Sequence, residues 1–396
     1  MNLARERILF IAALALAFLL ASMPAHGQAR PADQAGKPLM SEDAFKNIQV
    51  LRGIPAKEFM ETMGFFAASL SLNCSDCHGD ASGSDWANYA IDTPLKQTAR
   101  RMVIMVNAIN KANFGGTRSV TCYTCHRSNQ RPKIIPSLAA QYAEPPEEDP
   151  DEIEPIPGAR VTVTAEQVLN KYVQALGGAA ALAKLTSFTG KGTYEGFDSD
   201  FGQVPVDVYA KSPEMRAMVV HMKGGDSTST YDGRDGWAAG PVTLAPIPVV
   251  QLFGGGLEGA RLDAQMTFPA QIKQILTDWK AGYPSLTVDG HPLDIIEGKM
   301  PSGVRVRLYF DKTTGLLVRQ VRNTETLVGT ITTHVIYSDY RPVAGVKVPF
   351  QWQTTWVDGQ YTVKLASVQP NATIDAARFG KPLPPAPVQN RAAAAQ

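Results

Sequence analysis

Two stretches of the chain share one design: METMGFFAASLSLNCSDCH at residues 60–78 and TARRMVIMVNAINKANFGGTRSVTCYTCHR at residues 98–127. In each, apolar residues at helical spacing are followed by a short polar stretch and then by the pattern CxxCH. These two patterns use all four cysteines of the chain. We therefore expect a small, helix-rich domain over residues 45–135 that folds around the two cysteine pairs.

The CxxCH pattern is typical of covalent haem attachment. Two thiols three positions apart can add to the two vinyl groups of one haem, and the next residue presents its imidazole to the iron. The pattern occurs twice, so two haem c groups are the predicted cofactors. The predicted residues are Cys74 and Cys77 with His78 as iron ligand, and Cys122 and Cys125 with His126 as iron ligand.

Three other uses of paired cysteines compete with haem. A zinc site made of two CxxC pairs needs no histidine after each pair, and its four thiolates would be open to oxidation outside the cytoplasm. Disulfides are the usual expectation for an even number of cysteines in an exported chain. A thioredoxin-like motif needs a pair that follows a strand in a βαβ unit, and neither pair has that setting. Haem attachment alone explains both histidines.

The helix before each motif offers methionines as the second axial ligand. In the helix predicted over residues 56–70, Met63 lies in the middle of an apolar stripe, and Met60 is its local rival. Before the second motif, Met102 and Met105 are both candidates. Ligation by histidine and methionine would raise the haem potential relative to two histidines, which suits electron transfer.

Over residues 48–132 the chain resembles the cytochrome c subunit of photosynthetic reaction centres. In that family a helix, a turn and a CxxCH motif serve each haem, and the helix supplies a methionine ligand. The resemblance therefore implies Met63 for the first haem and Met102 for the second.

The chain departs from that family in three respects. The reaction-centre subunit has four haem motifs and this chain has two, Ser128 replaces the usual glycine after CYTCHR, and a foreign β domain follows. We therefore expect a dihaem carrier of a respiratory or other chain, and not docking to a photosynthetic reaction centre.

The first 27 residues have the pattern of a signal peptide. Arg5 and Arg7 precede an apolar run over residues 8–21, which is shorter than the ~20 residues that cross a bilayer. An uncleaved anchor is the alternative. We expect export to the periplasm of a Gram-negative bacterium, with the protein soluble or peripherally bound to a membrane, and a disordered stretch over residues 28–44.

Proline and acidic residues dominate residues 136–160. Prolines exclude a long helix, and seven carboxylates between residues 144 and 154 repel one another, so we expect an extended linker. A docking site for a basic partner is the alternative. The end of the chain, residues 383–396, is expected to be disordered.

Residues 161–382 have the pattern of a mainly antiparallel β domain with helices. A capping box at Thr164 and Gln167 opens a helix that Gly177 and Gly178 stop, and a short helix follows. A further helix is predicted over residues 268–279. Alternating strands with turns between them make up the rest: GKGTYEG, VPVDVYA, MRAMVVHM, STSTYDG, VRVRLYFD, LLVRQVR, THVIYSDY, FQWQTTWV and YTVKLASV.

This domain resembles the LolA-like fold of periplasmic lipoprotein carriers, through STSTYDGRDGW at 227–237 and LYFDKTTGLLVRQV at 308–321. The resemblance implies a curved antiparallel sheet, or half-barrel, that wraps helices and can hold a lipid-like or quinone-like ligand. A scaffold that docks the haem domain to a partner is the alternative. The predicted fold class is therefore multidomain: an all-α dihaem cytochrome domain and an α+β domain.

The predicted function is electron transfer between redox partner proteins, without catalysis by side chains. A net charge of +1 gives no general attraction to nucleic acid. A dihaem peroxidase is a second hypothesis, which needs an open iron and which Met63 and Met102 disfavour. A carrier of an apolar ligand, with haems that report redox state, is the third.

Overall fold

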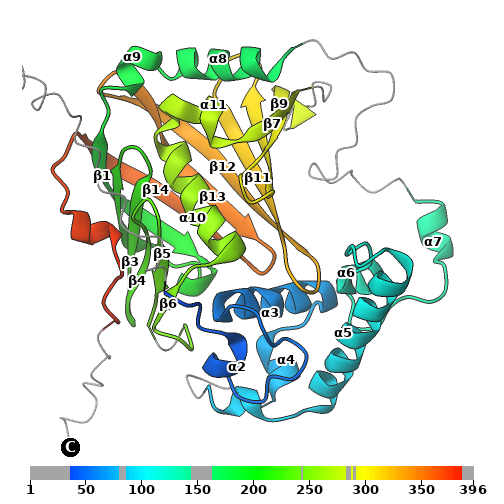
Figure 1. The fold of residues 1–396 in the computed structure, drawn as a ribbon. Helices are drawn as coiled ribbons and strands as arrows, with labels where there is room; N and C mark the ends of the chain where they lie inside the picture. The colour runs from blue at the N-terminus through cyan, green and yellow to red at the C-terminus, as the bar shows by residue number, and fades with distance from the viewer. Residues whose placement is uncertain are drawn as a thin grey trace, which may run out of the picture. The chain divides into compact units, whose positions relative to one another are not determined.

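A helical N-terminal region and a large antiparallel sheet make up the computed structural model of the chain (Figure 1). The structure describes residues 36–79, 86–143, 163–241, 244–281, 287–288 and 291–385. The described residues from Pro38 onward belong to one compact unit. The predicted fold class, helices followed by an antiparallel α+β domain, is confirmed.

The predicted helices before the two motifs are present, and local sequence explains their ends. The long helix before the second motif begins after Thr93, whose hydroxyl accepts a hydrogen bond from the backbone N–H of Lys96 at 3.2 Å. Pro94 takes the first helical position, where its missing N–H costs nothing. The elements of this region are α2 (Ser41–Ala44), α3 (Ala56–Leu70), α4 (Cys74–His78), η2 (Asn88–Ala90), α5 (Pro94–Asn113), α6 (Cys122–His126) and α7 (Leu138–Gln141).

Ordered structure begins before the predicted boundary at residue 45. Met40 pairs with Pro55 in an isolated β-bridge, and α2 follows. The hydroxyl of Ser41 is buried and donates to the carbonyl of Leu51 at 2.6 Å. This hydrogen bond joins residues ten apart and orders the segment around α2, although the polar composition of that segment does not predict order.

Several predicted segments lie wholly or partly outside the described residues. They are the signal peptide at 1–27, the stretch 28–35, the linker residues 144–160 and the tail residues 386–396. The described part of the predicted linker includes the single turn α7.

The described strands of the second domain pair antiparallel throughout and form one sheet. Its order is β6-β5-β4-β3-β2-β1-β14-β13-β12-β11-β10-β9-β7, and β8 pairs with β9. The nine predicted strands are all present, and β5, β6, β7, β8 and β9 add to them. The strands are β1 (Ser187–Gly196), β2 (Val204–Lys211), β3 (Met215–Met222), β4 (Gly225–Tyr231), β5 (Gly236–Ala239), β6 (Val249–Gln251), β7 (Thr277–Ala281), β8 (Thr287–Val288), β9 (His291–Lys299), β10 (Arg305–Asp311), β11 (Leu317–Glu325), β12 (Thr330–Val343), β13 (Val346–Trp356) and β14 (Gly359–Pro370).

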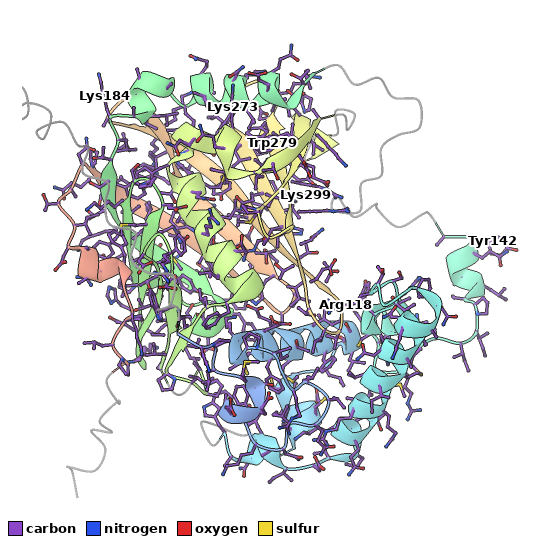
Figure 2. The ribbon with its side chains drawn as sticks, viewed as in Figure 1. Arg118, Tyr142, Lys184, Lys273, Trp279 and Lys299 are labelled. Atoms are coloured by element: carbon purple, nitrogen blue, oxygen red, sulfur yellow. The ribbon has the colours of Figure 1, made fainter. Side chains whose placement is uncertain are left out.

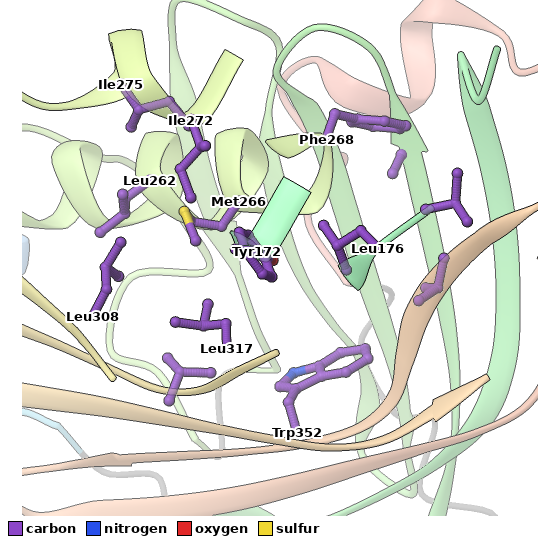
Figure 3. Packing of buried hydrophobic residues seen from close by; sticks show 14 of the residues in the cluster. Tyr172, Leu176, Leu262, Met266, Phe268, Ile272, Ile275, Leu308, Leu317 and Trp352 are labelled. Atoms are coloured by element: carbon purple, nitrogen blue, oxygen red, sulfur yellow. The ribbon is translucent and has the colours of Figure 1, made fainter. Parts of the chain in front are cut away.

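Helices cover one face of this sheet and enclose the main core (Figure 1). The capping box at Thr164 and Gln167 opens the first of them as predicted. Side chains from helices and strands meet in the core, as Figure 3 shows for Leu262 and Met266 opposite Leu308 and Leu317. The helices and 3₁₀ turns of this domain are α8 (Ala165–Ala175), α9 (Ala179–Leu182), η3 (Phe197–Ser199), α10 (Gly254–Thr267), η4 (Pro269–Gln271), α11 (Ile272–Ile275) and η5 (Ala376–Phe379).

The helix predicted over residues 268–279 is wrong in position. The main helix is α10, which ends at Thr267, and only the 3₁₀ turn η4 and the single turn α11 fall in the predicted range. Trp279 lies in β7, and its indole N–H donates to the carbonyl of Lys273 at 3.3 Å (Figure 2). Three glycines open α10 and lower its intrinsic helix propensity, whereas Leu262 is fully buried against the sheet. Packing therefore outweighs propensity here.

A smaller apolar cluster forms around α3. Phe65 is buried with Leu51, Val103, Val328 and Ile331. The last two belong to the turn between β11 and β12 and to the start of β12. The helix that carries Met63 is thus held by residues that lie more than two hundred positions away in sequence.

Candidate functional site

Both CxxCH motifs form a single helical turn with a capping box at its start. Asn73 accepts from the backbone N–H of Asp76 at 3.1 Å, and Asp76 accepts from the backbone N–H of Asn73 at 2.8 Å. Thr121 and Thr124 form the same reciprocal pair at the second motif. Helical geometry brings the first and fourth residues of each motif, which are the two cysteines, to one face of the turn. Two thiols on one face are what attachment to one haem requires.

The two motif histidines make the same hydrogen bond. Nδ1 of His78 donates to the carbonyl of Tyr89, and Nδ1 of His126 donates to the carbonyl of Asn129, both at 3.0 Å. A proton fixed on Nδ1 leaves Nε2 as the nitrogen with a free lone pair, which is the arrangement of a histidine that binds a metal. Burial lowers the pKa of His78, which also favours the neutral ring.

The two motifs are packed together through α3 and α5. The helix α3 contacts α6, which belongs to the other motif, and α5 contacts both α4 and α6. Ser128, just after α6, donates its backbone N–H to the carbonyl of Ser69 and its hydroxyl to the carbonyl of Ala68, both at 3.0 Å. The two predicted haem sites therefore belong to one packed unit.

Ser128 takes the position at which the resemblance led us to expect glycine, and its backbone conformation is one that favours glycine. Its φ is +56°, in the left-handed region that glycine adopts most easily. Arg127 before it is also left-handed, with φ of +47°. The two hydrogen bonds to α3 hold Ser128 in this conformation.

The candidate methionines differ in their surroundings. On α3 the buried face is formed by Thr62, Phe65 and Ser69. Met63 is half-buried and packs against the small apolar cluster around Phe65. Met60 is also half-buried but is not part of that cluster. The predicted apolar stripe is thus not the most buried face, which leaves Met63 with surface to offer to a bound group.

On α5 the two candidates separate by exposure. Val103 and Val106 are buried, Met102 is half-buried, and Met105 is 43% exposed. Met102 is therefore closer to the packed side of the helix than Met105. This agrees with the choice that the family resemblance implies, and direct ligation stays a proposal.

Lys96 was not predicted as a site residue, and the structure places it beside the first motif. Its ammonium group donates to the carbonyls of Tyr89 at 2.8 Å and Ile91 at 2.7 Å. The ring of Tyr89 packs on His78, with centroids 4.8 Å apart, and on Trp86. Sequence carries no signal for this role, because it depends on how the loop before α5 folds back.

The cysteines do not have the features of a zinc site or of a reactive dithiol. All four are free, and among the residues that the structure describes no three His, Cys, Asp or Glu side chains are placed to hold a metal ion. Burial raises the pKa of Cys77 and raises that of Cys122 to about 11. A thioredoxin-like cysteine needs a lowered pKa, so these thiols have the opposite character.

A second site is a cavity in the β domain between the sheet and its helices. It opens to solvent, and its volume is about 80 Å³. Apolar and tyrosine side chains form most of its wall, and its charged residues are Arg216, Asp263 and Lys347. A lining of this kind suits a ligand with a large apolar part and few polar groups.

Comparison with known proteins bears on the helical region first. Residues 16–172 match the family model described as photosynthetic reaction centre cytochrome C subunit. The helical region is similar to that family. The reaction-centre cytochrome c subunit of Thermochromatium tepidum is 39% identical over 108 residues, which are 26% of this chain and 25% of that protein. The corresponding subunit of Rubrivivax gelatinosus is 31% identical over 109 residues, 26% of this chain and 27% of that protein. The chain thus spans about a quarter of the length of these relatives.

Solved structures resemble the other part of the chain. A LolA superfamily protein from Nitrosomonas europaea covers 55% of this chain and 98% of its own, with a TM-score of 0.35 and 14% identity. A DUF1329 family protein from Desulfovibrio piger covers the same shares, with a TM-score of 0.38 and 12% identity.

Among the described residues, no helix has both the length and the apolar character needed to cross a membrane.

Proposed function

We propose that the chain is a dihaem c-type cytochrome that transfers electrons between redox partners. The observation that carries this proposal is the shared geometry of His78 and His126. Each ring ends a capped helical turn that begins with a cysteine pair, and each donates Nδ1–H to a backbone carbonyl at 3.0 Å. The relationship to cytochrome c subunits supports the same conclusion.

The residues present fit a covalently held haem at each motif. The thiols of Cys74 and Cys77, and those of Cys122 and Cys125, would form the thioether bonds. His78 and His126 would bind iron through Nε2, and the backbone carbonyls would keep each ring in one orientation. The iron, when bound, supplies a one-electron couple.

Met63 and Met102 would complete the two coordination spheres. Both lie half-buried on helices that are packed into the unit that holds the motifs. A thioether ligand from each methionine would leave no coordination position of the iron open to small molecules. The chain's role would then be to hold two six-coordinate haems near one another. A peroxidase requires an iron with an open coordination position. The placement of the two methionines therefore supports an electron carrier over a peroxidase.

The proposed partners are redox proteins in the periplasm of a Gram-negative bacterium, with the chain soluble or peripherally bound there. A role in photosynthesis does not follow, because the chain spans only about a quarter of the reaction-centre subunits it matches. The domain boundaries at residues 45–135 and 161–382 are part of the proposal. So is a lipid-like or quinone-like ligand in the β domain, which the cavity supports.

Attachment itself is tested by counting covalent haem per chain after export with the cytochrome c maturation machinery. The full chain should carry two haems that survive denaturation. The variant C74A/C77A should carry one, and C122A/C125A should carry the other. A chain without covalent haem, or one whose haem count ignores these substitutions, would contradict the proposal.

A further inference from the structure

We infer that the β-domain cavity binds a single-chain amphiphile with an anionic head group, and that Arg216 and Tyr337 bind the head. The inference rests on the proposed apolar ligand of this domain and is independent of the haems. It adds the chemical class of that ligand and the residues that select it.

The first observation is an unbalanced positive charge in the cavity wall. The guanidinium of Arg216 lies 5.6 Å from the centre of the Trp352 ring, and no carboxylate of the described residues lies within 4 Å of it. Asp263 is the acidic residue of the wall, and it faces Arg322 at 3.7 Å. The guanidinium of Arg216 therefore has no carboxylate at ion-pair distance, and Lys347 is a second cation of the wall, so an anion would be stabilised in this mostly apolar space.

The second observation is a tyrosine hydroxyl in the wall of the same cavity. Three of the cavity tyrosines have partners: Tyr340 donates to a backbone carbonyl at 2.7 Å and also bonds Tyr172, and Tyr361 bonds Thr354. Tyr337 has no hydrogen-bond partner among the described residues. Burial raises its pKa well above the ordinary value, so at neutral pH the hydroxyl is a donor. The charge of Asp263 raises the pKa of Tyr337 further, and the charge of Arg216 lowers it.

The apolar wall accounts for the chain of the ligand. Figure 3 shows Tyr172, Met266, Leu317 and Trp352, which come from α8, α10, β11 and β13 and line the cavity together. These side chains offer dispersion and burial to methylene groups and provide no polar contact along most of the wall. An extended hydrocarbon chain matches such a surface.

Charge distinguishes this ligand from a quinone. A quinone carbonyl could accept a hydrogen bond from Arg216, but it would leave the guanidinium charge uncompensated when the ligand seals the cavity from water. A carboxylate or phosphate oxygen would accept from the guanidinium in a bidentate manner and also from the Tyr337 hydroxyl. The anionic amphiphile therefore satisfies both groups.

Binding of three twelve-carbon probes to the full-length haem-loaded protein tests the inference. Dodecanoate, dodecyl phosphate and dodecanol share one chain and differ in the head, and calorimetric titration gives each Kd. We expect the unsubstituted protein to bind dodecanoate at least tenfold more tightly than dodecanol. R216M should abolish this preference and leave the Kd for dodecanol within about twofold, whereas R216K should keep most of it. Y337F should weaken dodecanoate binding several-fold.

A matched control removes a different cation of the same sheet. Arg305 is exposed on β10 and is not part of the cavity wall, so R305M should leave all three affinities unchanged. Circular dichroism of each variant, together with its retained dodecanol binding, shows that the cavity is still folded.

The outcomes separate the inference from the broader proposal of an apolar ligand. Equal affinity for dodecanoate and dodecanol, or a preference that survives R216M, would overturn the head-group assignment and leave an apolar site. No binding of any probe would overturn both. If dodecyl phosphate binds more tightly than dodecanoate, the anionic site is supported with a phospholipid-derived source; the reverse order supports it with a free fatty acid.

Discussion

Lys96 and His78 bond to the same acceptor, the carbonyl oxygen of Tyr89. The ammonium group lies 2.8 Å from that oxygen and the imidazole Nδ1 lies 3.0 Å from it. At the second motif the carbonyl of Asn129 accepts from His126, and no lysine or arginine of the described residues donates to it. The two otherwise similar sites therefore differ by one cation that is hydrogen-bonded to the carbonyl acceptor of the proximal histidine.

This charge should set the order of the two haem potentials. A cation near the first haem disfavours its oxidised state, and it also competes for the carbonyl that would make His78 a stronger electron donor. We predict that K96M lowers the potential of the first haem by roughly 60 mV, a tenfold change in a one-electron equilibrium. The second haem should not change, and K96R should keep the original value. A redox titration followed optically measures both, and equal shifts at the two haems would contradict the account.

Replacing the proposed methionine ligands should open one iron at a time. M63A should allow carbon monoxide to bind the first reduced haem, and M102A the second, because no thioether would then hold the sixth position. M60A and M105A are matched controls on the same helices and should leave both haems closed. Binding of carbon monoxide in M60A but not in M63A would reassign the first ligand to the neighbouring methionine.

Gly329 and Phe65 should show strong coupling in stability. A Cβ added at Gly329 would lie 2.2 Å from Cζ of Phe65, which is buried. We predict that G329A lowers the free energy of unfolding by about 1–3 kcal/mol through overpacking, and that F65L in the same chain recovers part of the loss. G256A is the control, since the nearest atoms there lie 3.7 Å or more away and alanine favours a helix. Urea denaturation of the unsubstituted protein, G329A, F65L, the double variant and G256A measures these effects, and additive effects of G329A and F65L would argue against the contact.

His221 should make the β domain slightly more stable at acidic pH. Burial lowers the pKa of His221, but hydrogen bonds to Asp226 at 2.9 Å and Asp207 at 3.3 Å outweigh it, so the pKa is raised above 6.5. A raised pKa adds stability that is complete below about pH 6.5 and is lost as pH rises through the folded-state value. The gain should be only a few tenths of a kcal/mol, because the side chain is 39% exposed. Unfolding of H221Q at several pH values should lack this component, and identical pH profiles would exclude it.

Much of the fold follows from local sequence patterns. Thr93 and Pro94 predict the start of α5, and the alternating residues of MRAMVVHM predict β3 with its observed bounds. The pattern fails where packing decides the outcome. The three glycines of α10 disfavour a helix that burial against the sheet stabilises, and β9 has too little alternation to be separated from a loop.

The candidate site likewise has residues that local sequence predicts and residues that depend on the three-dimensional fold. The motif cysteines and histidines follow from spacing alone, because their chemistry requires residues close together in sequence. Lys96 could not be predicted, because it acts through a carbonyl whose position depends on the loop fold. The buried face of α3 was also missed, since Phe65 is covered by a turn that lies far away in the chain.

The most direct test of the central claim is an optical redox titration of the exported protein, with carbon monoxide added to the fully reduced form. The account predicts two one-electron transitions from two low-spin haems per chain, neither of which changes its spectrum with carbon monoxide. A haem that binds carbon monoxide in the unsubstituted protein would contradict the two closed His/Met centres and favour a redox enzyme or sensor.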